Sequence, residues 1–149
     1  MIASLAATAP TQFLDSGGTR FAYRRFGTPV GTPLVFIQHF MGNLDNFDPA
    51  ISDALAAGRE IILFDNAGVG RSTGTAPGTI AGLAADAAGF IDGLGLTSVD
   101  ILGHSMGGEI AQLITLDRPD PPSSSTAATT SSYRRSTHTT STSTSPTPS

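Results

Sequence analysis

The chain has 149 residues, of which 39% are hydrophobic, and its formal net charge is −4. This length suits one domain, and the absence of cysteine excludes a thiol nucleophile, a disulfide and a Cys-ligated metal. All eight Lys and Arg positions are arginine, which excludes catalysis or phosphate binding by lysine. Because the balance of charge is acidic, we expect no nucleic-acid partner, and we expect neither a metal nor a cofactor.

Strand-like and helix-like segments alternate through residues 1–120, which is typical of an α/β domain. Apolar residues at helical spacing predict a helix over Ile80–Leu94, ended by Gly95, and this helix should connect two parallel strands. A second amphipathic helix should follow Ser105 and end before Pro119. Apolar runs predict strands at Thr19–Gly27, Leu34–Phe40, Ile61–Asp65 and Val99–Gly103.

The serine at position 105 lies between a predicted strand and a predicted helix. It is the centre of the motif Gly103-His104-Ser105-Met106-Gly107. A Gly-x-Ser-x-Gly sequence at such a junction builds a tight turn that exposes the serine hydroxyl. We therefore interpret Ser105 as a nucleophile.

Three segments together resemble the α/β-hydrolase superfamily over about residues 11–119: LVFIQHFMGNLDNFDP, IILFDNAGVGRS and ILGHSMGG. The resemblance implies the N-terminal half of an α/β-hydrolase fold, with a mostly parallel sheet and flanking helices. It also implies an oxyanion hole made by the backbone N–H groups of Phe40 and Met106. The chain departs from the family where Gln38 and His39 replace the common His-Gly pair.

The loop from Asp65 to Ser72 is rich in glycine but fits neither the P-loop nor the dinucleotide-binding pattern. In the family that the chain resembles, this loop is structural. The resemblance implies that Asp65 and Arg71 form hydrogen bonds that hold the loop near the site.

The acid and the base of a catalytic triad have no convincing candidates in the chain. In the α/β-hydrolase order both follow the serine. Two of the later carboxylates, Asp117 and Asp120, lie at the far end of the helix that begins beside Ser105, and the later histidine, His138, lies in a Ser/Thr-rich segment. Neither His39 nor His104 replaces the base. We expect the acid and base to be absent and the chain to be inactive as written, which leaves open whether it is an enzyme.

Composition changes after residue 120. Of the 29 residues 121–149, 19 are Ser or Thr and four are Pro. So polar a segment has little to bury, and we predict a disordered low-complexity tail, either a native linker or a frameshift product. The strand at Val99–Gly103 would then lack its next neighbour and leave an open sheet edge through which the protein could self-associate.

Three interpretations remain open. The first is a truncated serine hydrolase whose ancestral activity cleaves an ester or related acyl bond of a small molecule. The second is a non-catalytic binding or interaction module, and the third is a degraded gene product without a function. Since we find no export signal or long apolar run, we expect a cytoplasmic protein without a membrane partner.

Overall fold

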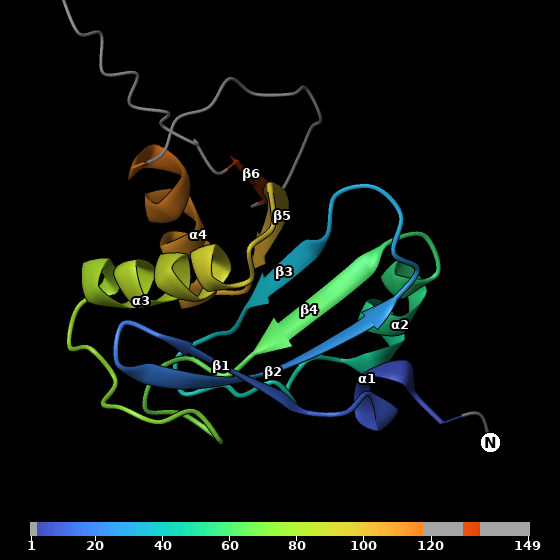
Figure 1. The fold of residues 1–149 in the computed structure, drawn as a ribbon, viewed down its shortest axis with the longest axis horizontal. Coiled ribbons are helices and arrows are strands. Elements are labelled where there is room, and N and C mark those ends of the chain that lie inside the picture. Colours follow the sequence, from blue (N-terminus) through green and yellow to red (C-terminus); the bar gives the residue numbers. More distant parts are fainter. Residues whose placement is uncertain (1–2, 118–129, 135–149) are drawn as a thin grey trace, which may run out of the picture.

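The computed structural model describes residues 3–117 and 130–134, which form a sheet with helices on both faces (Figure 1). The sheet has six strands in the order β1-β2-β4-β3-β5-β6. The strands are β1 (Gln12–Ser16), β2 (Thr19–Gly27), β3 (Leu34–Ile37), β4 (Glu60–Phe64), β5 (Ser98–Gly103) and β6 (Thr130–Arg134). The helices are α1 (Leu5–Thr8), α2 (Pro49–Ala56), α3 (Ile80–Gly93) and α4 (Met106–Asp117).

The sheet is mixed, which corrects the expectation of a mostly parallel one. Strand β3 runs parallel to both β4 and β5, whereas the β1–β2, β2–β4 and β5–β6 pairs are antiparallel. Gly17 and Gly18, both with positive φ, form a tight turn between β1 and β2. These two strands therefore pair as an antiparallel hairpin. The parallel strands are joined by helices, as predicted for α3.

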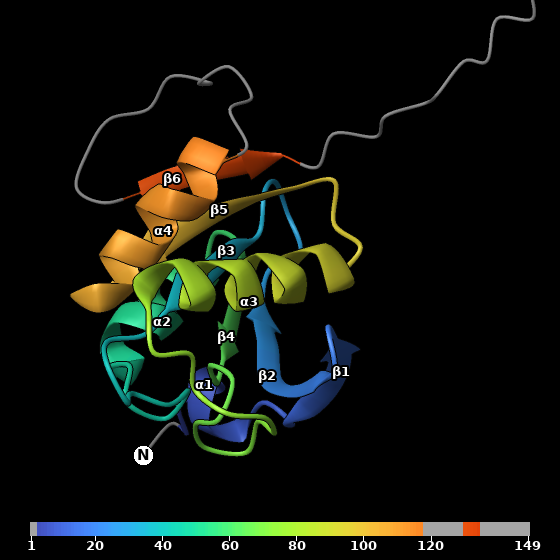
Figure 2. The ribbon, with the colours of Figure 1, turned by 90° about the vertical axis from the view of Figure 1, so that its left-hand side faces the viewer.

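Alternate residues of the central strands face two helical layers (Figure 2). Helices α3 and α4 cover one face, where Phe64 and Ile37 join the larger core. Helices α1 and α2 cover part of the other face, where Phe36 and Leu63 join a smaller core. Strand β3 and residues 61–64 of β4 are buried on both faces, which agrees with their continuously apolar sequences.

Strand β3 ends at Ile37, three residues before the predicted end at Phe40. From Gln38 the chain leaves the sheet, and a backbone hydrogen bond from Gly42 N–H to the His39 carbonyl closes a turn at 3.0 Å. The apolar side chain of Phe40 therefore lies in a loop, where it is 68% exposed.

The edge of β5 that we expected to be open is paired with β6, so that prediction is wrong. Strand β6 pairs antiparallel with β5 from Ser98 to Leu102. An edge strand offers unpaired N–H and C=O groups, and any extended segment can satisfy them. The rest of residues 121–149, for which we predicted disorder, lie outside the described residues.

The described residues contain no helix with both the length and the apolar character that a membrane crossing demands.

Candidate active site

Ser105 occupies the turn between β5 and α4 in a backbone conformation that side chains rarely adopt. Its φ is 56°, in the left-handed region, and within the described ranges Met41 is the other non-glycine residue with positive φ. This conformation costs free energy in an L-residue, and such strain concentrates at functional sites. The Ser105 side chain is exposed, as expected for a nucleophile elbow.

The two glycines of the motif are required by close backbone contacts. A Cβ atom on Gly107 would collide with the carbonyl oxygen of Ile37 at the end of β3. A Cβ atom on Gly103 would collide with the carbonyl oxygen of Gly107. The His104 N–H donates to the Ile37 carbonyl at 3.0 Å, which ties the elbow to β3. These close contacts explain why both positions of the motif are glycine.

The structure brings Phe40 and Met106 to one small, mostly apolar cavity beside α3, whose lining also includes Leu83. These are the two residues predicted to supply backbone donors. The N–H of Phe40 donates to no acceptor in the described part of the chain. Met106 is the first residue of α4, where backbone N–H groups have no partner within the helix. Neither N–H is thus occupied by another group among the described residues.

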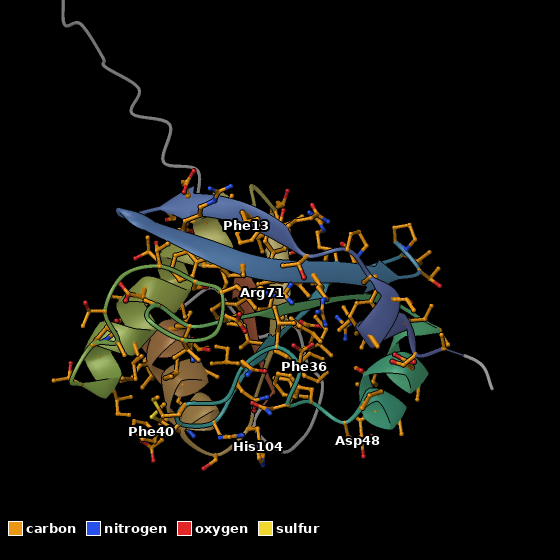
Figure 3. The ribbon with its side chains drawn as sticks, turned by 90° about the horizontal axis from the view of Figure 1, so that it is seen from below. Phe13, Phe36, Phe40, Asp48, Arg71 and His104 are labelled. Atoms are coloured by element: carbon orange, nitrogen blue, oxygen red, sulfur yellow. The ribbon has the colours of Figure 1, made fainter. Side chains whose placement is uncertain are left out.

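Two histidines lie near the elbow, and neither forms a hydrogen bond with Ser105. The rings of His39 and His104 pack edge to face with centroids 5.6 Å apart. Nδ1 of His39 donates to the Phe40 carbonyl at 2.8 Å. Phe40 and His104 lie at the same end of the molecule (Figure 3). The Ser105 hydroxyl makes no hydrogen bond with residues 3–117.

The carboxylates and histidine that follow Ser105 do not change this result. Glu109 is exposed in the first turn of α4 and makes no hydrogen bond with Ser105, and Asp117 is exposed at the last residue of α4, the end opposite the elbow. Asp120 and His138 lie outside the described residues. The part of the chain that is described also contains no group of three His, Cys, Asp or Glu side chains able to hold a metal.

A larger cavity of about 290 Å³ opens on the other face of the sheet, between α2 and the ends of β3 and β5. His104 lines this cavity and does not line the one formed by Phe40 and Met106. The cavity is mostly apolar, and no motif pointed to it. Its lining residues are Phe36, Gln38, Asn46, Phe47, Asp48, Ile51, Leu102 and His104.

Asp65 has the structural role that was predicted for it. Its buried carboxylate accepts hydrogen bonds from the backbone N–H of Leu44 at 2.7 Å and of Arg71 at 2.9 Å. These two contacts join the segment after β3 to the loop after β4. The guanidinium of Arg71 donates to Thr11 Oγ1 at 3.1 Å, which also holds the loop.

We expect Asp65→Asn to lower the free energy of unfolding by about 1–3 kcal/mol, because its amide nitrogen cannot accept and leaves one buried N–H group without a partner. Urea denaturation measures this change. Asp15→Asn is the control, since Asp15 is exposed on β1. Equal unfolding free energies for the two variants would contradict the anchoring role.

Known proteins share this architecture. The family model described as alpha/beta hydrolase fold matches residues 32–145. A solved alpha/beta hydrolase fold protein from Chitinophaga pinensis is similar with a TM-score of 0.74 and 50% identity, over 77% of this chain and 42% of that one.

Two curated relatives have names that describe different activities. The dihydrolipoyllysine-residue acetyltransferase component of the acetoin cleaving system of Cupriavidus necator is 38% identical over 76% of this chain and 30% of its own length. A rhodomycin D methylesterase from Streptomyces peucetius is 30% identical over 74% of this chain and 39% of its own length. The chain thus spans well under half the length of these relatives.

Proposed function

Because this chain belongs to the alpha/beta hydrolase fold family, we propose that it carries the nucleophile of a hydrolase that cleaves an ester or related acyl bond, and that this nucleophile is Ser105. The observation that carries the proposal is the positive φ of Ser105 between two glycines that have no space for a side chain. A structural serine has no need of a strained and exposed turn.

In the proposed reaction, Ser105 Oγ attacks the carbonyl carbon of the substrate. The carbonyl oxygen becomes negatively charged, and the backbone N–H groups of Phe40 and Met106 stabilise it by hydrogen bonds that need no rearrangement. The alcohol then leaves and an acyl-enzyme remains, which water hydrolyses. The apolar lining of the small cavity favours an apolar group next to the reacting carbonyl.

Two of the relatives support an ester as the substrate. The Streptomyces peucetius protein is named a methylesterase, and the mouse relative, 32% identical over 58% of this chain, is named a diacylglycerol lipase. Both names describe cleavage of an ester. We propose the same bond type for this chain, with a small molecule as the substrate.

Residues 1–149 by themselves should turn substrate over slowly, since no base is hydrogen-bonded to Ser105 among the residues that the structure describes. A serine hydroxyl without a positioned base is a weak nucleophile at neutral pH. When triad residues are removed from an intact protease, roughly 10³–10⁴-fold catalysis over water remains. We expect the rate enhancement of residues 1–149 over water to be no larger than this.

The test supplies a base from solution. Purified protein is treated with a phosphonofluoridate, with and without added imidazole, and the product is measured by intact mass. We expect one adduct on Ser105 that forms slowly without imidazole and faster with it, because imidazole accepts the proton from Oγ. Ser105→Ala, treated in parallel, should show no adduct.

Two outcomes would contradict this proposal. Equal labelling of the wild type and Ser105→Ala would place the reaction on another side chain. A wild-type chain that is folded by circular dichroism and gains no adduct at any imidazole concentration would exclude a working nucleophile. That second result would favour the non-catalytic binding module.

A further inference from the structure

Gln38 is the first residue of the loop 38–43, which also contains Phe40, and its polar side chain is buried beneath that loop. Its side-chain oxygen Oε1 accepts from the backbone N–H of His39 at 3.0 Å. Its side-chain nitrogen Nε2 donates to the backbone carbonyl of Asn43 at 3.2 Å. Gln38 is only 1% exposed. One side chain thus bridges the two ends of the loop.

The rest of the loop is folded tightly around this side chain. A Cβ atom on Gly42 would collide with Cγ of Gln38, so the backbone lies directly against the amide. Between the two bridged ends, Met41 has a φ of 60°. A non-glycine residue keeps such a conformation only when its surroundings impose it. The bridge made by Gln38 is one such constraint.

We propose that Gln38 is a positioning residue that holds the Phe40 N–H in the oxyanion hole; this inference rests on the proposed function of Ser105. An oxyanion donor acts only when it is fixed close to the place where the negative charge develops. The Gln38 bond to His39 fixes the residue before the donor, and the His39 ring fixes the Phe40 carbonyl after it. Both sides of Phe40 are therefore held.

Phosphonylation of Ser105 measures this positioning. The bond from Oγ to phosphorus forms while the phosphorus–fluorine bond breaks, fluoride leaves with the electron pair, and the Oγ proton passes to imidazole. Negative charge grows on the phosphoryl oxygen, where the Phe40 N–H donates. A misplaced donor should slow bond formation and leave the initial binding of the reagent unchanged.

The experiment compares Gln38→Met, which has a similar length but neither hydrogen bond, with Gln38→Asn, whose amide is too short to bridge both ends. We expect the maximal labelling rate of Ser105 to fall roughly 100-fold in both, with an unchanged half-saturating reagent concentration. Asp53→Asn is the matched control, because Asp53 binds the backbone N–H groups of Leu5 and Ala6 in α1 and none in the loop. It should label at the wild-type rate.

A second measurement follows the loop without any chemistry. Amide hydrogen exchange of His39 should accelerate in Gln38→Met, since this N–H loses its acceptor, and should be unchanged in Asp53→Asn. If the wild-type protein is labelled at Ser105 and both folded Gln38 variants are labelled at the same rate, the role of Gln38 is overturned and the proposed function stands. Absence of the wild-type adduct would overturn the proposed function and this inference with it. An unchanged His39 exchange rate in Gln38→Met would show that the bridge does not hold the loop.

Discussion

Replacing Phe90 by alanine should lower the free energy of unfolding by about 3–5 kcal/mol, which is the usual cost of removing a buried phenylalanine. Phe90 is fully buried on α3, and its ring stacks on Phe64 with centroids 4.3 Å apart. The rings of Phe21 and Tyr23 lie at 5.5 and 5.6 Å. This side chain therefore connects the crossover helix to both β2 and β4.

This loss should be large relative to the total free energy of unfolding. Domains of this size are stable by about 5–15 kcal/mol, so Phe90→Ala should unfold a large part of the population under conditions where the wild type is folded. Urea denaturation followed by far-UV circular dichroism measures it. Phe13→Ala is the control, because Phe13 is 46% exposed on β1 and contacts mainly Arg20. Similar losses for the two variants would mean that the core around Phe90 is not formed in solution.

The sequence predicted the regular elements where hydrophobic periodicity is long. The apolar spacing from Ile80 onward predicted α3 to within a residue or two, and the strand predicted at Thr19–Gly27 is β2 with its observed bounds. Helix α2 was missed although Asp48 and Pro49 form a known start signal, in which Asp48 accepts from Ala50 N–H at 2.9 Å. The eight residues of this helix are too few for a clear periodic pattern.

The strand β6 was missed for a different reason. Composition favours disorder where little can be buried, and the segment around Thr130 is mostly Ser and Thr. Pairing with β5 depends on the backbone groups of an edge far away in sequence, and composition carries no information about such a partner. Strand β1 was also missed, although its partner is local: its five residues pair with β2 across a short turn at Gly17 and Gly18.

Some features of the candidate site could be predicted from the sequence, and others could not. The motif around Ser105 is local, so the elbow, its two glycines and the strand-to-helix setting could be predicted. The role of Gln38 could not, because it depends on where the amide lies in three dimensions and on the return of the chain to Asn43. The sequence showed only that Gln38 and His39 depart from the family pattern.

Gly107→Ala should remove both the elbow and much of the stability. The added methyl group would overlap the Ile37 carbonyl oxygen, and both atoms belong to rigid parts of the fold, the start of α4 and the end of β3. Relief requires α4 to move away from the sheet. Overpacking of this kind costs about 1–3 kcal/mol and more where backbone must shift. We expect a loss of roughly 3 kcal/mol by urea denaturation, at the upper end of that range.

The same variant should lose labelling at Ser105 even in the fraction that stays folded. A displacement of about 1 Å at the reacting atoms can lower a rate roughly 100-fold. Ser105 directly precedes α4, and Met106, the proposed donor, is the first residue of that helix. Gly58→Ala is the matched control, since a Cβ atom there meets no neighbour within 4 Å and its φ is not in the left-handed region. It should keep both stability and labelling. If Gly107→Ala behaved like Gly58→Ala, the contact between the elbow and β3 would be looser than the structure has it, and the steric argument for the motif would fail.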